Sequence, residues 1–130
     1  MKRLVCWLGL VLAPLGVFAQ VFGTVDAVNG QVTIVSTDGT TTTPVVGQKL
    51  MVGQTVQTQT AGELHAVTED GGLLALRPGT TFIMQRYQAT QDGKSVIDMS
   101  LIKGALRSIT GWIGKLNPSG YRVTTGTATV

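Results

Sequence analysis

Apolar and polar residues alternate in short runs along most of the chain, and glycine-containing pairs separate these runs. FGTVDAV (residues 22–28) and QVTIVS (residues 31–36) are two such runs. A period of two residues is typical of a strand with one buried face. Asn29-Gly30 joins the runs and predicts a hairpin, because the usual two-residue hairpin turn needs a positive φ at both positions.

The central stretch ELHAVTEDGGLLALRPGTTFIM (residues 63–84) predicts three more strands separated by turns. Arg77-Pro78-Gly79 has proline at the second position of a β-turn, which fixes its φ near the value that the turn requires. Asp-Gly pairs at 38–39, 70–71 and 92–93 mark further turns, since an aspartate side chain bonds nearby backbone. The expected inward side chains are Leu64 with either Ala66 or Val67, Leu74, Leu76, Phe82 and Met84.

The C-terminal region predicts a strand from about Ile97 to Thr110, then an irregular loop or a single helical turn. A longer helix over LRSITGWIGKL is disfavoured, because each of its two interior glycines costs about 1 kcal/mol. Asn117-Pro118 predicts a turn, and a last strand follows from Tyr121. Residues 121–130 lack the prolines and charges that protect edge strands, apart from Arg122, so we expect this strand at a sheet edge.

Together these runs predict one all-β domain, a compact roll or short solenoid-like sandwich of short, mainly antiparallel strands. Abundant threonine, valine and glycine favour strands and turns over helices. A chain of this length buries about two-thirds of its unfolded surface, which is enough for one core. The expected core residues are Val25, Val32, Ile34, Leu50, Val56, Leu64, Leu74, Leu76, Phe82, Met99, Leu101, Leu106 and Val123.

The first 19 residues have the pattern of a secretory signal peptide. Lys2-Arg3 precedes an apolar stretch over residues 4–18, and small residues stand at −3 and −1 of a cleavage after Ala19. This apolar stretch contains Pro14 and is shorter than the roughly 20 residues that span a bilayer. The sequence therefore predicts a signal peptide at 1–19, an exported domain at 20–130 and no membrane span after cleavage.

Cleavage changes the charge balance of the chain. It removes two of the ten basic residues and none of the seven acidic ones, which leaves a net charge of +1. No cluster of lysine and arginine remains, so the sequence predicts no nucleic-acid partner. The single cysteine, Cys6, leaves with the signal, so the exported domain has no disulfide and depends on packing for its stability.

The residues of the exported domain offer no pattern typical of catalysis. Its one histidine, His65, lies within a strand pattern and is interpreted as a partly exposed strand residue. A zinc site would need partners at a suitable spacing, which Glu63, Glu69 and Asp70 do not provide. The single acids of the Asp-Gly turns lack the clustered oxygens of a calcium site. Without a nucleophile elbow or a phosphate loop, we expect no enzyme, no cofactor and no metal.

Two blocks in this order resemble the FecR domain family. Residues 47–62 form the frame G-x-x-L-x-x-G-x-x-V-x-T-x-x-x-G, and residues 101–130 resemble the family's L-x-L-x-x-G-x-L-R-x-V-T-G block with its following N-P and Y-R-V. The likeness covers nearly all of residues 21–130. The residues that match the family's structural motif are Gly47, Leu50, Gly53, Val56, Thr58, Gly62, Asp70, Gly71, Pro78, Gly104, Leu106, Arg107 and Gly111.

The sequence also departs from the family pattern. Gln54 stands where the family usually has aspartate, Gly72 where serine follows the Asp-Gly turn, and Gly126 where proline is typical. The family's closing Arg-Gly-Thr is absent. From this resemblance we expect a FecR-like domain that lacks its terminal segment.

The resemblance implies a domain used for contacts outside the cytoplasm. FecR regulators are anti-sigma sensors with a cytoplasmic region and a membrane span, and neither is expected here, so the sensor function is not carried over. We expect a non-catalytic protein-interaction or envelope-scaffold module, periplasmic or secreted, with an envelope or extracellular protein as its partner. The alternative is a glycan or cell-wall binding module, whose aromatic platforms would be Tyr87, Trp112 and Tyr121.

Overall fold

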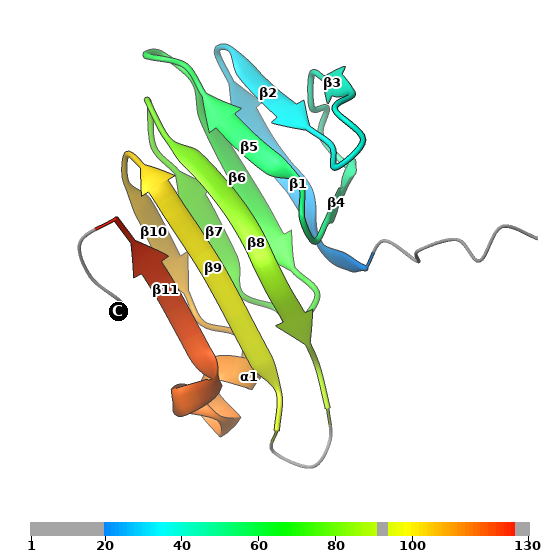
Figure 1. The fold of residues 1–130 in the computed structure, drawn as a ribbon, viewed down its shortest axis with the longest axis vertical. Coiled ribbons are helices and arrows are strands. Elements are labelled where there is room, and N and C mark those ends of the chain that lie inside the picture. Colours follow the sequence, from blue (N-terminus) through cyan, green and yellow to red (C-terminus); the bar gives the residue numbers. More distant parts are fainter. Residues whose placement is uncertain (1–19, 91–93, 127–130) are drawn as a thin grey trace, which may run out of the picture.

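The computed structural model describes residues 20–90 and 94–126. These residues form two β-sheets packed face to face, with short helical segments at one end (Figure 1). The predicted signal peptide, the predicted turn at Asp92-Gly93 and the last four residues of the predicted C-terminal strand lie outside the described residues.

Sheet A has five strands and sheet B has six, and the chain crosses repeatedly between them. Sheet A is ordered β10 (Leu106–Ile109), β7 (Leu73–Leu76), β6 (Glu63–Thr68), β1 (Val21–Asn29) and β4 (Lys49–Met51). Sheet B is ordered β11 (Tyr121–Thr125), β9 (Val96–Lys103), β8 (Thr81–Gln88), β5 (Thr55–Thr58), β2 (Val32–Val35) and β3 (Thr41–Thr42). Neighbouring strands are antiparallel except β11, which runs parallel to β9. The expected all-β class is confirmed, in the form of a sandwich.

The core lies between the sheets and consists of the side chains that alternate inward from both. Most of the expected core residues are buried, and Ala66 rather than Val67 points inward from β6. The prediction was wrong for Leu101, Leu106 and Val123, which are only partly buried. These three residues lie where β10 and β11 form the edges of their sheets, so one layer does not fully cover the other.

The predicted turn at Asn29-Gly30 is present, but the predicted hairpin is wrong, because β1 belongs to sheet A and β2 to sheet B. Gly30 has a φ of 69°, whereas no non-glycine residue in the described ranges has a positive φ. A Cβ on Gly30 would lie 2.2 Å from the carbonyl oxygen of Ala61. The turn therefore packs tightly against the β5–β6 connection, and the chain passes from one layer to the other at this corner.

The single strand predicted from Ile97 to Thr110 is two strands in different sheets. Gly104 has a φ of 93°, and a Cβ there would lie 2.5 Å from Cα of Thr80. The backbone N–H of Ala105 donates to Oγ1 of Thr80 at 3.1 Å. The chain turns at this point from β9 in sheet B to β10 in sheet A.

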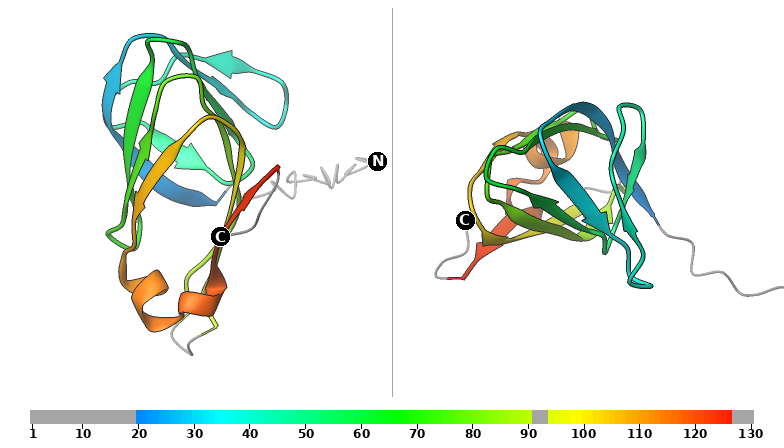
Figure 2. Two further views of the ribbon diagram at one scale, coloured as in Figure 1. Left: turned by 90° about the vertical axis from the view of Figure 1, so that its left-hand side faces the viewer. Right: turned by 90° about the horizontal axis from the view of Figure 1, so that it is seen from above.

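The rest of the C-terminal region follows the prediction. α1 (Trp112–Leu116) is the expected helical turn, and η1 (Pro118–Gly120) is the turn that Asn117-Pro118 predicts. β11 then forms an edge of sheet B. Figure 2 (left) looks onto this side of the molecule and shows β10 and β11 in different layers.

The glycines of the 47–62 frame stand at bends between short strands. Gly47 and Gly53 both have a φ of 90°, a conformation that favours glycine over residues with a side chain. The backbone N–H of Gly53 donates to the carbonyl of Met84 at 2.9 Å. This bond lies where the chain leaves β4 in sheet A and enters β5 in sheet B.

Candidate functional site

Tyr87, the first of the three candidate aromatic residues, is a core residue. It lies on the inner face of β8, is 2% exposed, and its ring centroid is 6.4 Å from that of Phe22. An aromatic side chain in this position cannot stack on a ligand at the surface. The interpretation of Tyr87 as part of a binding surface is therefore wrong, and the reason is the irregularity of β8 between Met84 and Arg86, after which Tyr87 points inward.

The hydroxyl of Tyr87 belongs to a buried hydrogen-bond cluster around Asp70. It donates to Oδ1 of Asp70 at 2.9 Å and accepts from the backbone N–H of Asp70 at 2.8 Å. Thr68 Oγ1 donates to the same Oδ1 at 2.5 Å, and the backbone N–H of Ile113 donates to Oδ2 at 3.2 Å. The carboxylate thus joins the β6–β7 turn, β8 and α1.

This cluster explains the chemistry of its two ionisable groups. Asp70 is 4% exposed, and a buried carboxylate needs hydrogen-bond donors in place of water. Burial, reinforced by the hydrogen bond to Asp70, raises the pKa of Tyr87 well above its usual value, so the phenol stays a donor. The sequence identified Asp70 as a turn residue but gave no sign of its contacts with β8 and α1.

Tyr121 lies at the side of the sandwich, on the inner face of β11. Its hydroxyl is hydrogen-bonded to the hydroxyl of Ser108 in β10. Burial raises its pKa. Since this bond links the two edge strands near the α1 end, Tyr121 closes one end of the space between them.

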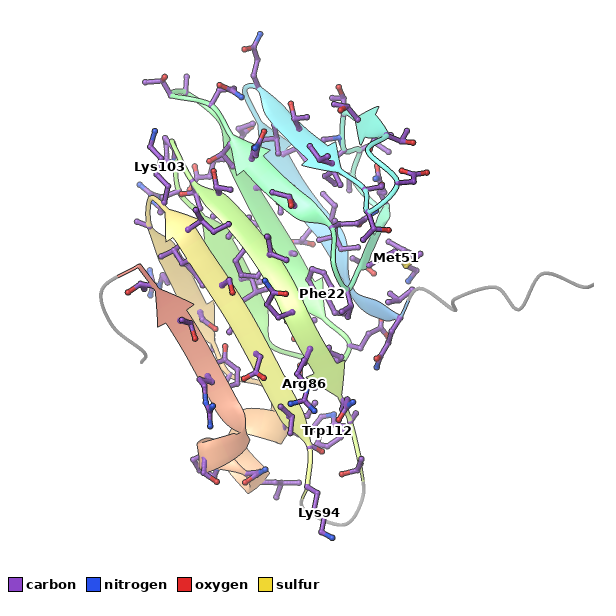
Figure 3. All side chains as sticks on the ribbon, viewed as in Figure 1. Phe22, Met51, Arg86, Lys94, Lys103 and Trp112 are labelled. Carbon is purple, nitrogen blue, oxygen red and sulfur yellow. The ribbon has the colours of Figure 1, made fainter. Side chains whose placement is uncertain are left out.

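Trp112, the third candidate, is 42% exposed at the start of α1. Its backbone N–H donates to the carbonyl of Asp70 at 3.1 Å. Figure 3 places Trp112 near the α1 end and Lys103 at the opposite end of the molecule. With Tyr87 in the core, the three aromatic residues do not share one surface.

His65 lies on the outer face of sheet A as a partly exposed residue, and its side chain is 38% exposed. Its Nε2 is 3.2 Å from Oε1 of Glu63, and the guanidinium of Arg77 is 2.6 Å from the same oxygen. The hydrogen bond with His65 and the charge of Arg77 hold the pKa of Glu63 below its usual value. Within the described ranges, no group of three or more His, Cys, Asp or Glu side chains could hold a metal ion. This cluster is therefore a surface ion-pair network.

An apolar cleft of about 350 Å³ lies between β10 and β11, where the two sheets come to an edge on the same side. It is lined by Leu101, Leu106, Ser108, Tyr121, Val123 and Thr125. A further hollow of about 220 Å³ adjoins it and shares Leu101 and Thr125 with it. We refer to the first of these spaces, the cleft of about 350 Å³ between β10 and β11, as the seam cleft.

Three basic residues lie in the same part of the chain as the seam cleft but do not share one border. Arg107 in β10 and Arg122 in β11 are exposed on the outer faces of strands in different sheets, so they point away from the cleft on opposite faces of the sandwich, and Lys103 lines the polar hollow with Gln57 and Gln59. None of the three forms an ion pair with another residue in the ranges 20–90 and 94–126. No acidic residue follows Asp98 in the sequence, whereas four basic ones do.

Sequence reasoning missed the seam cleft because its lining residues have the same alternation as the true core. Leu101, Leu106 and Val123 were predicted as core, and only the placement of β10 and β11 in different sheets leaves them half-buried. One signal in the sequence could have indicated the surface. The absence of acidic residues after Asp98 marks this region as different in charge from the rest of the domain.

Two polar hollows lie at the end of the sandwich that is opposite α1. One of about 370 Å³ is lined by Gly30, Gln31, Val32, Thr33, Thr43 and Gln59. A second of about 180 Å³ lies beside it and shares Gln59. Amide and hydroxyl groups dominate both, and they offer hydrogen bonds to a polar ligand but no aromatic ring.

No protein-family model matches the chain, and no curated protein matches it. A solved structure described as a cell surface anchoring domain is similar with a TM-score of 0.46 and 22% identity, over 48% of this chain and 82% of that chain. A similarity this weak does not bear on function. None of the helices in the described ranges has the length and hydropathy of a membrane span.

Proposed function

We propose that this chain is an exported, non-catalytic module that binds a protein of the cell envelope or the extracellular space. The observation that carries the proposal is the seam cleft, an apolar space of about 350 Å³ between two edge strands, with the hydroxyl groups of Ser108 and Thr125 in its lining. An apolar surface with a polar rim is typical of protein interaction sites. The signal-peptide pattern of residues 1–19 supports export, and the resemblance to FecR domains supports contacts outside the cytoplasm.

The proposal also rests on the chemistry that the side chains offer. His65 is engaged with Glu63, and Asp70 with Tyr87, Thr68 and α1. Neither group borders a cleft in which a substrate would meet an acid and a nucleophile. We infer binding rather than catalysis as the role of the domain.

A pull-down with the mature domain, residues 20–130, tests this function. The immobilised domain is incubated with solubilised envelope proteins, and a Val123→Arg variant that places a charge in the seam cleft serves as the comparison. Thr124→Arg is the matched control, because Thr124 is the exposed neighbour of Val123 on the other face of β11. We expect an envelope protein that is retained by the wild type and the control but not by Val123→Arg, with all three folded by circular dichroism. Equal retention by all three proteins would contradict a role for the cleft.

A second candidate function is glycan binding, which the polar hollows around Gln59 favour. Amides and hydroxyls are suitable partners for sugar hydroxyls, although aromatic platforms are absent from these hollows. Co-sedimentation with insoluble cell-wall polysaccharide separates the two functions. Sedimentation that is lost in Gln59→Ala and survives protease treatment of the wall would favour glycan binding.

A further inference from the structure

We propose that the two polar hollows around Gln59 form one groove that binds a glycan with a carboxylate group, and that Lys103 binds this carboxylate. The inference rests on the second candidate function, glycan binding, and names the chemical class of its ligand. It does not involve the seam cleft. We refer to the two hollows together as the polar groove.

Four polar side chains cross sheet B in one row at the polar groove. The row consists of residues that are successive register partners on β2, β5, β8 and β9: Thr33, Gln57, Thr81 and Lys103. Thr33 lines the larger hollow, and the other three line the smaller one. Adjacent strands are about 4.8 Å apart, so the row spans about 14 Å. An extended trisaccharide has a comparable length, so its rings can contact the whole row.

The amide groups of the polar groove are not used by the fold. In the described part of the chain, the side chains of Gln31, Gln57 and Gln59 form no hydrogen bond with another residue. By contrast, Oε1 of Gln54 accepts from the backbone N–H of Met51 at 2.9 Å. An amide has both donors and an acceptor, as sugar hydroxyls do, so the three groove amides can exchange water for ligand hydroxyls.

The main chain beneath these side chains is held by hydrogen bonds. The backbone N–H of Gln59 donates to the carbonyl of Gln31 at 2.9 Å, and the carbonyl of Gln59 accepts from the N–H of Gly79 at 3.0 Å. Oγ1 of Thr58 accepts from the N–H of Thr80 at 2.8 Å. These bonds join the β1–β2, β5–β6 and β7–β8 connections. A groove built on a fixed main chain loses little conformational entropy when a ligand binds.

Lys103 gives the polar groove its selectivity. Among the residues that the structure describes, it is the one charged residue that lines either hollow. It is exposed and forms no ion pair within residues 20–90 and 94–126. A carboxylate accepts a stronger hydrogen bond from an ammonium group than a neutral hydroxyl does. A sugar ring with a carboxylate near Lys103 therefore uses a group that a neutral glycan leaves unpaired.

The lining of the polar groove argues against a peptide strand as its occupant. Apart from Val32, which is buried, the lining residues are polar or glycine. The apolar side chains of a peptide would find no apolar surface to cover there, whereas a glycan presents hydroxyl groups on every ring. No aromatic ring lines either hollow within the described ranges, so recognition depends on hydrogen bonds and charge rather than on stacking.

The test uses isotope-labelled residues 20–130 and two trisaccharides that differ only at C6. The β-1,4-linked glucuronate trimer has a carboxylate there, whereas cellotriose has a hydroxymethyl group. NMR titration gives both the affinity and the position of binding. We expect the glucuronate trimer to bind at least about threefold more tightly than cellotriose, with an advantage that falls as salt increases. The amide signals that shift should be those of residues 30–33, 57–60, 79–81 and 103. Equal affinities, or shifts confined to the seam cleft, would overturn the inference.

Removal of the charge at Lys103 tests its role. Lys103→Gln should lower the affinity for the glucuronate trimer to that for cellotriose, because glutamine keeps a hydrogen-bond donor but has no charge. The affinity for cellotriose should change little. Lys115→Gln is the matched control, because Lys115 is exposed in α1 at the opposite end of the sandwich. Both positions are exposed, so the fold should persist, and circular dichroism checks this. A preference for glucuronate that survives in Lys103→Gln would overturn the proposed site.

Removal of two hydroxyl groups tests the row across sheet B. Thr33→Val with Thr81→Val should weaken the binding of both trisaccharides at least about threefold, because valine keeps the shape and strand preference of threonine without its hydroxyl. Thr55→Val is the matched control, because Thr55 is partly exposed on the same face of β5 as Gln57 but lines neither hollow. Unchanged affinities in the double variant would contradict binding along this row.

The outcomes separate this inference from glycan binding itself. If cell-wall polysaccharide sediments the domain in a manner that depends on Gln59, but the two trisaccharides bind equally or not at all, glycan binding stands and this inference fails. If sedimentation and trisaccharide binding are both absent, both fail. Retention of an envelope protein through the seam cleft is independent of either result.

Discussion

The region around β6, β7 and β8 and the region from β9 to β11 share one sequence pattern but differ in packing. In the first, inward side chains such as Leu64, Leu74 and Met84 are fully buried between the sheets. In the second, Leu101, Leu106 and Val123 alternate in the same way but are only partly buried. Alternation selects the face of a strand, but burial requires an opposing layer.

The two regions also differ in charge. Residues 20–98 include four basic and seven acidic residues, and the residues after Asp98 include four basic and no acidic ones. The net charge of +1 over residues 20–130 hides this asymmetry. The partly buried strand residues and this excess of basic residues thus belong to the same part of the chain, although the basic side chains point away from the seam cleft.

The largest expected effect compares the same substitution in both regions. Leu64 in β6 and Leu106 in β10 both pair in register with Leu76 of β7. Leu64→Ala should lower the free energy of unfolding by about 2–5 kcal/mol, because it leaves a cavity in a closed core. Leu106→Ala should cost about 1 kcal/mol, because its side chain is already partly in water. Urea unfolding measures both, and equal losses would contradict the packing difference.

The next prediction compares the hydroxyl groups of Tyr87 and Tyr121. Tyr87→Phe should lower the free energy of unfolding by about 1–3 kcal/mol, because it leaves the backbone N–H of Asp70 without its partner inside the core. Tyr121→Phe should cost less, since the hydroxyl of Ser108 is only partly buried and reaches water. Thermal unfolding of both variants tests this, and a larger loss for Tyr121→Phe would refute the order.

A third prediction compares two glycines with the same φ, Gly53 beside β8 and Gly47 at the preceding bend. Gly53→Val should cost about 1 kcal/mol or more, because φ is 90° and a Cβ would lie 3.0 Å from Cγ2 of Thr37. Gly47→Val has the same φ but no atom within 4 Å of its Cβ, so it should cost less. Melting temperatures decide this. A Gly53→Val protein as stable as the wild type would contradict the interpretation that the bend at residue 53 requires glycine.

The smallest effect is a dependence on alkaline pH. The pKa of Tyr87 is raised from 10.0 by burial, so the folded state favours the protonated phenol. This contribution is fully present below pH 10 and is lost as pH rises from 10 toward the raised pKa. The melting temperature of the wild type should therefore fall above pH 10 more steeply than that of Tyr87→Phe. Parallel curves for the two proteins would show that Tyr87 is not the group responsible.

Much of the fold could be predicted from local pattern. The strands over residues 63–84, the helical turn after Gly111, the turn at Asn117-Pro118 and the strand from Tyr121 all follow from alternation and turn chemistry. The two errors in strand connection, at Asn29-Gly30 and at Gly104, have one cause. In each case a glycine with positive φ takes the chain to the other sheet, and the apolar pattern continues unchanged across it.

The candidate site was less predictable than the fold. The sequence predicted Tyr87 as a surface aromatic, but the residue is buried in the core. The alternation of β8 shifts at the irregularity between Met84 and Arg86, so Tyr87 points inward. The contacts of Asp70 join residues 17 and 43 positions away, which local patterns do not report. The cleft between β10 and β11 came into view only when these strands were placed in different sheets on the same side of the sandwich.

The sequence by itself determined the all-β class and the inward face of most strands, because alternation and glycine turns act over a few residues. Only the tertiary structure decided which inward faces are covered, since that depends on how many strands each sheet contains and where they end. The seam cleft belongs to this second kind. It exists because sheet A ends at β10 while sheet B continues to β11, and no local pattern specifies that difference.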